Sequence, residues 1–172
     1  VELAQRAPDS WALRHRVVEF VDAPMSQEVV QCALDAARHN SPACKALPED
    51  MKARFVLGEE ILNELPDQEQ ATAVYSKFLL TLGLLAWRVG DHNKASRYLN
   101  SAHDIAALLS DVQLQVECLI AMGGLEAGRG EFSLALEAYE KARRLAPDHP
   151  SLERYSGMLY QQTGNHEQAI HA

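Results

Sequence analysis

A pattern of three small residues, G-x6-G-x4-A, occurs three times in the second half of the chain and constrains the fold more than any other feature. Six of the nine glycines in the sequence belong to it. The copies comprise Gly83, Gly90 and Ala95, then Gly123, Gly130 and Ala135, and then Gly157, Gly164 and Ala169. A pattern repeated at intervals of this size indicates a fold built from stacked, similar units.

Each copy predicts a tight hairpin of two helices. The second glycine suits the left-handed backbone at the end of a helix. A polar residue that can cap the next helix follows it each time, as Asp91, Glu131 and Asn165. We expect the first glycine and the alanine to lie on facing helices and to pack together, Gly83 on Ala95 and Gly123 on Ala135, so that the two backbones approach closely.

The first half of the chain also reads as helical, because no segment of useful length alternates with the period of a strand. Prolines and capping residues divide it. We predict helices that run from Asp9 or Ser10 to just before Pro24, from Ser26 to about Asn40, from Glu49 to Leu65, and from a cap at Asp67 through the apolar residues Val74 to Val89. The third of these carries Phe55, Leu57, Ile61 and Leu62 on its apolar face. The fold class expected is all-α.

Around the repeated glycines the sequence resembles the tetratricopeptide repeat (TPR) family. The matching residues are Leu79, Leu82, Gly83, Ala86, Ala95, Leu99 and Ala102 in the first copy, Leu119, Met122, Gly123, Ala135, Tyr139, Ala142 and Pro147 in the second, and Gly157, Tyr160 and Ala169 in the third. The resemblance implies a right-handed superhelical stack of antiparallel helix hairpins, a TPR-like solenoid. The first copy departs from the family because it is 40 residues from the second, against the usual 34. The third copy stops inside its second helix, and we expect more chain to follow.

This reading divides the chain into two parts. Residues 1–75 form an N-terminal helical region that packs on the array or caps it, and the linker-like segment SPACKALPED within it is a candidate seam. Residues 76–172 form the array, with repeats at about 76–115, 116–149 and, in part, 150–172.

The glycine-rich stretch AMGGLEAGRGEFS, residues 121–133, raises the alternative of a phosphate-binding loop. Gly123 and Gly128 have the required spacing, but Arg129 and Gly130 replace the Lys-Ser/Thr pair and no strand precedes them. The stretch is therefore interpreted as a helix followed by a turn. Gly124 and Gly128 have no role in the hairpin pattern, and each costs about 1 kcal/mol against alanine inside a helix. We interpret them as room for the backbone of a partner or for a bulky side chain.

The resemblance also implies a ligand surface on the concave side, formed by the first helix of each hairpin. Carried over by position, the partner-binding residues are Leu80, Leu84, Trp87, Arg88, Ile120, Gly124, Ala127, Arg154, Tyr155, Met158 and Gln162. A second interpretation of Leu80, Leu84 and Trp87 stays open, because a stripe at this spacing is also what burial against the N-terminal helices would produce.

Composition excludes several other classes of function. The net charge of −8 argues against nucleic-acid binding, which depends on Lys and Arg, and no apolar run reaches the ~20 residues of a membrane span. Three cysteines without a CxxC pair indicate neither disulfides nor a metal site, and they suit the cytoplasm. No catalytic constellation is recognisable, and neither a cofactor nor a metal ion is expected.

We therefore predict a noncatalytic, cytoplasmic protein-protein interaction module that holds a partner peptide or helix in the concave groove. Two alternatives remain beside it. One is a small acidic chaperone like those of type III secretion, which the chain resembles in size, acidity and repeat count. The other is a scaffold or regulatory segment of a longer protein. A homo-oligomer is compatible with all three.

Overall fold

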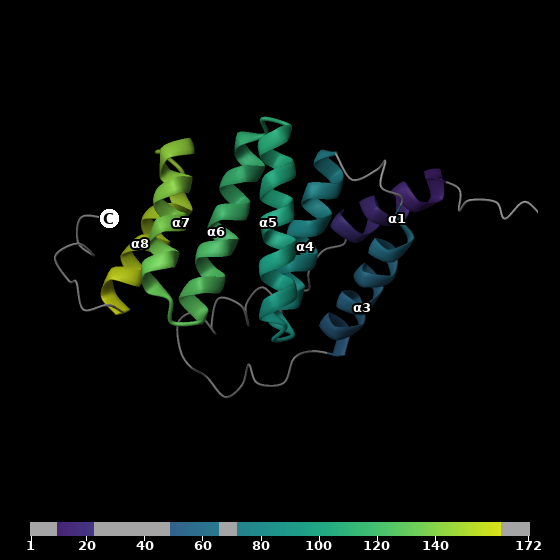
Figure 1. The fold of residues 1–172 in the computed structure, drawn as a ribbon, viewed down its shortest axis with the longest axis horizontal. Helices are drawn as coiled ribbons and strands as arrows, with labels where there is room; N and C mark the ends of the chain where they lie inside the picture. Colours follow the sequence, from purple (N-terminus) through teal and green to yellow (C-terminus); the bar gives the residue numbers. More distant parts are fainter. Residues whose placement is uncertain (1–9, 23–48, 66–71, 163–172) are drawn as a thin grey trace, which may run out of the picture.

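The computed structural model describes residues 10–22, 49–65 and 72–162. Every regular element in these residues is a helix, and the predicted all-α stack of hairpins is confirmed. The helices are α1 (Ser10–Asp22), α3 (Glu49–Glu64), α4 (Ala73–Arg88), α5 (His92–Leu108), α6 (Val112–Gly128), α7 (Phe132–Leu145) and α8 (Pro150–Gln162). Helices α4 to α8 stand side by side, and α1 and α3 lie at the α4 end (Figure 1). The second predicted helix lies outside the described residues.

The two complete hairpins, α4–α5 and α6–α7, are held together by a large side chain set against a glycine. A Cβ atom at Gly83 would lie 2.9 Å from Leu99 Cδ2, and one at Gly123 would lie 2.3 Å from Tyr139 Cε1. Ala95 and Ala135 are fully buried, but they are not the nearest neighbours of these glycines. The expected glycine–alanine pairing is therefore corrected, because the glycine makes room for Leu99 or Tyr139 one turn further along.

The three turns between α4 and α7 share one hydrogen-bonding pattern. In each turn a backbone N–H donates to a carbonyl five residues earlier: Asp91 to Ala86, Asp111 to Ala106, and Glu131 to Glu126, each with an N–O distance of 2.9 Å. The residue before the donor has a positive φ, at 87° for Gly90, 56° for Ser110 and 82° for Gly130. The predicted glycine turns are confirmed, and Ser110 adds one that the glycine pattern does not reveal.

Side-chain capping follows the sequence only in part. The Asp91 carboxylate accepts a hydrogen bond from the Lys94 backbone N–H at 3.0 Å, as predicted. Glu131 occupies the same position in the next hairpin without a side-chain bond, because its longer side chain suits this geometry less well. The cap of α4 is Thr72, which accepts from the Tyr75 N–H at 3.2 Å. The predicted cap Asp67 and the third polar residue, Asn165, lie outside the described residues.

The long step between the first two repeats has a clear structural origin. Helix α5 has 17 residues, whereas its counterpart α7 has 14. Helix α6 also begins about one turn further ahead of Gly123 than α8 begins ahead of Gly157. The extra residues therefore lengthen both helices at the α5–α6 turn, and Figure 1 shows this turn extending beyond the neighbouring helix ends.

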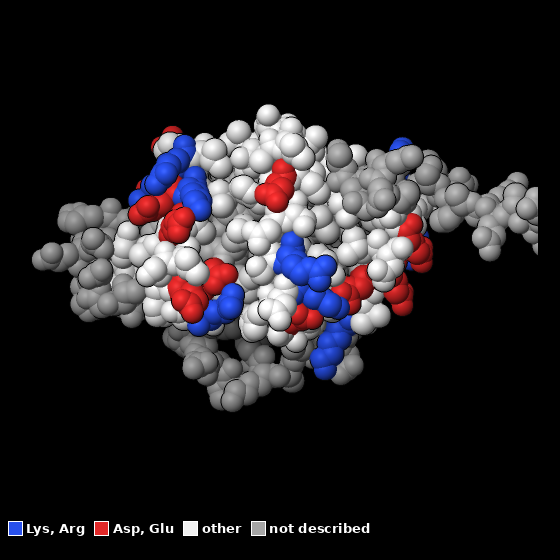
Figure 2. Space-filling model, in the orientation of Figure 1, with Lys and Arg blue, Asp and Glu red and all other residues white. Residues whose placement is uncertain are grey.

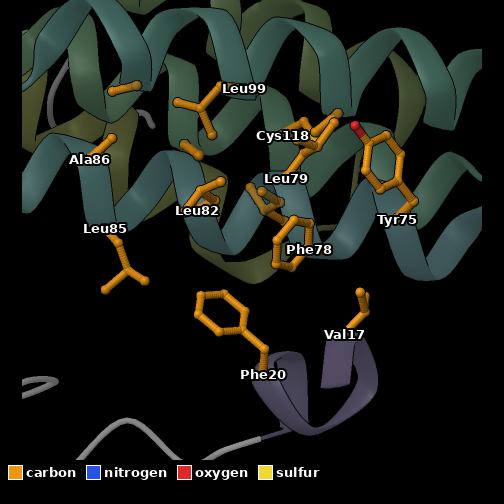
Figure 3. Close-up of a cluster of buried hydrophobic side chains, with 14 of the residues drawn as sticks. Val17, Phe20, Tyr75, Phe78, Leu79, Leu82, Leu85, Ala86, Leu99 and Cys118 are labelled. Atoms are coloured by element: carbon orange, nitrogen blue, oxygen red, sulfur yellow. The ribbon is translucent and has the colours of Figure 1, made fainter. Parts of the chain in front are cut away.

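The N-terminal helices pack on the outer side of α4. The rings of Phe20 in α1 and Phe78 in α4 meet edge to face with centroids 5.1 Å apart, and Figure 3 shows Val17 and Phe20 directed toward Phe78 and Leu82. A Cβ atom at Gly58 of α3 would lie 2.6 Å from Leu82 Cδ1. One hydrophobic core therefore continues from α1 and α3 into the array.

Polar contacts reinforce this attachment. Glu59 of α3 accepts hydrogen bonds from Lys94 and Tyr98 of α5, the latter at 2.9 Å. On α3, Leu57 is 44% exposed, so its predicted place on the apolar face is wrong. Met51 of α3 and Leu65, which directly follows the helix, are buried instead. The expected boundary between residues 75 and 76 falls within α4, and most of the predicted seam lies outside the described residues.

The turn geometry makes a prediction about Ser110. Replacing Ser110 with glycine should raise the free energy of unfolding by about 0.5 kcal/mol, because relief of the left-handed strain exceeds the added entropy of the unfolded chain. Gly90→Ala should lower the free energy of unfolding by about 1 kcal/mol, because alanine is strained at the positive φ of this turn. Ser101→Gly, at an exposed position within α5, is the matched control and should be destabilising. Urea unfolding measures all three, and a loss of stability in Ser110→Gly would contradict the turn assignment.

Candidate partner-binding face

Trp87 fills the space that two unexplained glycines leave on the neighbouring repeat. A Cβ atom at Gly124 would lie 3.3 Å from the Trp87 Cη2 atom, and one at Gly128 would lie 3.3 Å from Cζ2. The indole of α4 therefore lies across two turns of α6. The prediction that this space admits a partner's backbone is corrected, because the bulky side chain that occupies it belongs to the chain itself.

The Trp87 side chain is nevertheless only partly buried. The Arg88 guanidinium lies over its ring, with Cζ 5.1 Å from the centroid. Among the described residues no acceptor is hydrogen-bonded to the indole N–H, which lies near Gly128. Trp87 and Arg88 thus form a supported aromatic and cationic surface at the end of α4.

The apolar stripe Leu80, Leu84 and Trp87 is interpreted either as partner contacts or as buried core, and its residues differ in which of these fits. Leu80 is 8% exposed and belongs to the main core, so its prediction as a partner contact is wrong. Leu84 is partly buried against the same core. The N-terminal helices cover Phe78 and Leu82 instead, because these residues lie on a different side of α4. Of the three stripe residues, Trp87 is the one that packs on the next repeat.

The remaining predicted positions continue along α6 and α8. Ile120 and Ala127 of α6 are partly buried and pack against the second core cluster. On α8, Tyr155 stacks on Tyr139 with ring centroids 5.8 Å apart. Exposed Arg154 lies over Tyr155, with Cζ 4.9 Å from the ring and a hydrogen bond of 3.2 Å to its hydroxyl.

We use the name first-helix face for the surface formed by Leu84, Trp87, Arg88, Ile120, Gly124, Ala127, Arg154 and Tyr155. It has an arginine over an aromatic ring in each of α4 and α8, with Ile120 and Ala127 of α6 partly buried between them. Met158 and Gln162 lie on the same helix as Tyr155, but their side chains are outside the described residues, as are Gly164 and Ala169.

The described residues offer little support for a phosphate-binding loop, a metal site or a membrane span. The glycine-rich stretch forms the end of α6 and the following turn, as predicted. Within residues 10–22, 49–65 and 72–162, no three His, Cys, Asp or Glu side chains are grouped as metal ligands. The face in Figure 2 carries Lys and Arg interspersed with Asp and Glu. None of the helices in this part of the chain combines the length and apolar character needed to cross a membrane.

The fold and the packing of the hairpins identify the general class of this protein. Antiparallel hairpins with a glycine opposite a large residue, joined by near-identical turns, are those of a helical repeat protein. Residues 70–148 match the tetratricopeptide repeat family model. Repeats of this family generally mediate protein–protein interactions and are typically noncatalytic.

Several curated proteins are similar in sequence. The Photosystem I assembly protein Ycf3 of Prochlorococcus marinus (strain MIT 9312) is 30% identical over 114 residues, which cover 66% of this chain and 62% of that protein. The same-named protein of strain MIT 9215 is 29% identical over 116 residues. The Tonsoku-like protein of Bos taurus is 35% identical over 69 residues, 40% of this chain but 5% of that protein. The chain thus spans less than two thirds of each relative's length.

The packing of Trp87 on α6 can be tested by filling its site. Gly124→Leu should displace the indole, reduce the free energy of unfolding by about 1–3 kcal/mol, and shift the Trp87 emission to longer wavelength in a Trp11→Phe background. In the double variant with Trp87→Ala the two costs should not add, because the second change removes the clash. Gln113→Leu, at an exposed position of α6, is the control. Additive costs would show that Trp87 does not occupy this space.

Two buried groups predict a loss of stability at alkaline pH. Burial raises the pKa of Tyr139, and that of Cys118, each to about 12, above the ordinary values of 10.0 and 9.0. The folded chain therefore retains protons that the unfolded chain releases. The stabilisation that these two protonated groups give the folded chain is complete below about pH 9 and is lost as the pH rises toward 12. Urea unfolding at about pH 8 and about pH 10.5 should show this decrease, and Tyr139→Phe should reduce it. An unchanged decrease in that variant would contradict the assignment to Tyr139.

Proposed function

We propose that the first-helix face holds a segment of a protein partner and that the chain acts as a noncatalytic binding module. The observation that carries the proposal is the placement of Trp87. Two glycines in α6, each of which weakens its helix, allow the indole to lie flat and partly exposed beside Arg88. Rigid aromatic side chains beside arginine are the residues that contribute most to binding energy in protein interfaces.

The chemistry of this face narrows the kind of segment that it would bind. Trp87 offers an apolar surface and an N–H donor, while Arg154 and Tyr155 offer a cation and a second ring. Between them on α6 lie the partly buried side chains of Ile120 and Ala127. A peptide or helix with one apolar or aromatic anchor and nearby carboxylate or carbonyl oxygens would complement these groups.

The similar proteins favour a particular use of such binding. Two of them are named photosystem I assembly proteins, and we infer for this chain a comparable task of bringing subunits of a larger complex together. The match to a small part of the Tonsoku-like protein supports the alternative of a segment within a longer protein. The chaperone of type III secretion and the cytoplasmic location stay predictions.

The proposal is tested by selecting peptides from a random display library on the immobilised 172-residue chain and measuring their affinity by fluorescence anisotropy. Trp87→Ala should weaken the selected peptides at least about tenfold, because it removes the central anchor. Arg88→Ala should weaken those that carry carboxylates.

Leu134→Glu is the matched control, since this exposed residue lies on α7, away from the first-helix face. Circular dichroism verifies that each variant is folded. Peptides that bind the wild-type chain and Trp87→Ala equally, but lose affinity for the control, would place the binding surface elsewhere.

A further inference from the structure

A second surface, at one end of the stack, is independent of the first-helix face. Three exposed apolar side chains lie together there, among them the most exposed one in the described residues: Leu108 is 81% exposed, Val112 46% and Leu109 42%, all at the α5–α6 turn. Because the hairpins are antiparallel, the last turn of α7 lies at this same end, where Leu145 is 39% exposed (Figure 1). Exposed apolar side chains that cluster in this way indicate an interaction surface.

The turn is also where the first repeat departs from the usual spacing of the family. The additional residues of α5 and α6 are those that extend this turn past its neighbours. The unusual length thus produces a projecting apolar tip, which we define as Leu108, Leu109 and Val112. Burial of such side chains in an interface removes apolar surface from water and so stabilises the interface.

The charges around this end are separated by sign. From Tyr98 to Gly128 the sequence contains no Lys or Arg, and beside the tip the Asp104 side chain is 80% exposed. At the end of α7, by contrast, Lys141 and Arg144 are 55% and 77% exposed. Their ion pairs with Glu137 and Glu140 are solvent-exposed and weak, so they can be exchanged for others. Figure 2 shows the turn as uncharged surface and, over α7, Lys and Arg beside acidic side chains.

We propose that this end is the interface of a homodimer. A two-fold axis between the tip and the end of α7 places the tip of each chain against the α7 end of its partner. In this arrangement Leu108 and Leu109 of each chain contact the partner's Leu145, and Asp104 of each chain lies near the partner's Arg144. Each contact therefore occurs twice by symmetry. A second copy is the occupant that the charges favour, because acidic Asp104 beside the tip and basic Arg144 at the α7 end lie at the same end of one chain. The dimer leaves the first-helix face free, so this proposal does not depend on the proposed function.

Sedimentation equilibrium of the 172-residue chain from about 1 to about 100 µM tests the interface. The wild-type chain should change from a monomer to a species of twice 19.1 kDa. Leu108→Glu should weaken the dimer at least about tenfold, since the substitution occurs twice in it. Leu134→Glu, an equally simple change at an exposed leucine in the first turn of α7 at the opposite end, should leave the dimer intact.

A charge exchange distinguishes this geometry from general stickiness. Asp104→Lys and Arg144→Asp should each weaken the dimer by about twofold to fivefold, and the double variant should recover most of the loss. A wild-type chain that stays monomeric at the highest concentration would overturn the proposal and leave this end to a different protein. A dimer that tolerates Leu108→Glu, or charge variants that do not compensate, would overturn it as well.

Discussion

The array depends on one contact that is made once in each hairpin. A glycine in the first helix removes the only side chain that would keep the second helix at a distance, and Leu99 or Tyr139 occupies the resulting space. Since a Cβ atom at Gly123 would lie 2.3 Å from Tyr139 Cε1, any other residue there would displace the Tyr139 ring or the helix that carries it. The buried alanines and the shared turn geometry all follow from this separation, because closely spaced helices need small residues between them and short connections.

The same principle extends to both sides of the hairpins. At the N-terminal side, Gly58 allows Leu82 and Phe20 to meet α3, so these helices join the array through a continuous core instead of a surface contact. Toward the next repeat, Gly124 and Gly128 admit Trp87. The buried Ser76 hydroxyl donates to the Ala102 carbonyl at 2.7 Å, which satisfies a polar group inside the α4–α5 hairpin. At each of these glycines two helices can approach closely, and a large side chain from the neighbouring helix fills the space.

Much of this could be predicted from the sequence, and the remainder could not, for identifiable reasons. Helix boundaries and glycine turns depend on local chemistry, so the pattern at Gly90 and Gly130 located them. Partners across helices depend on which side chain reaches into a space, and spacing alone did not distinguish Leu99 from Ala95. Leu80 has the spacing of an exposed stripe, yet its side of α4 is buried. Ser110 adopts a glycine-like conformation without being glycine, although Asp111 after it, like Asp91 after Gly90, was a usable signal.

Trp87 has a consequence for the shape of the array that goes beyond recognition. The indole lies where the first helices of two successive repeats, α4 and α6, meet. The rotation between adjacent repeats determines the curvature of a solenoid, and this ring is one of the groups packed between two of them. A displacement of the ring would therefore change the contact between two repeats, and with it the curvature of the stack.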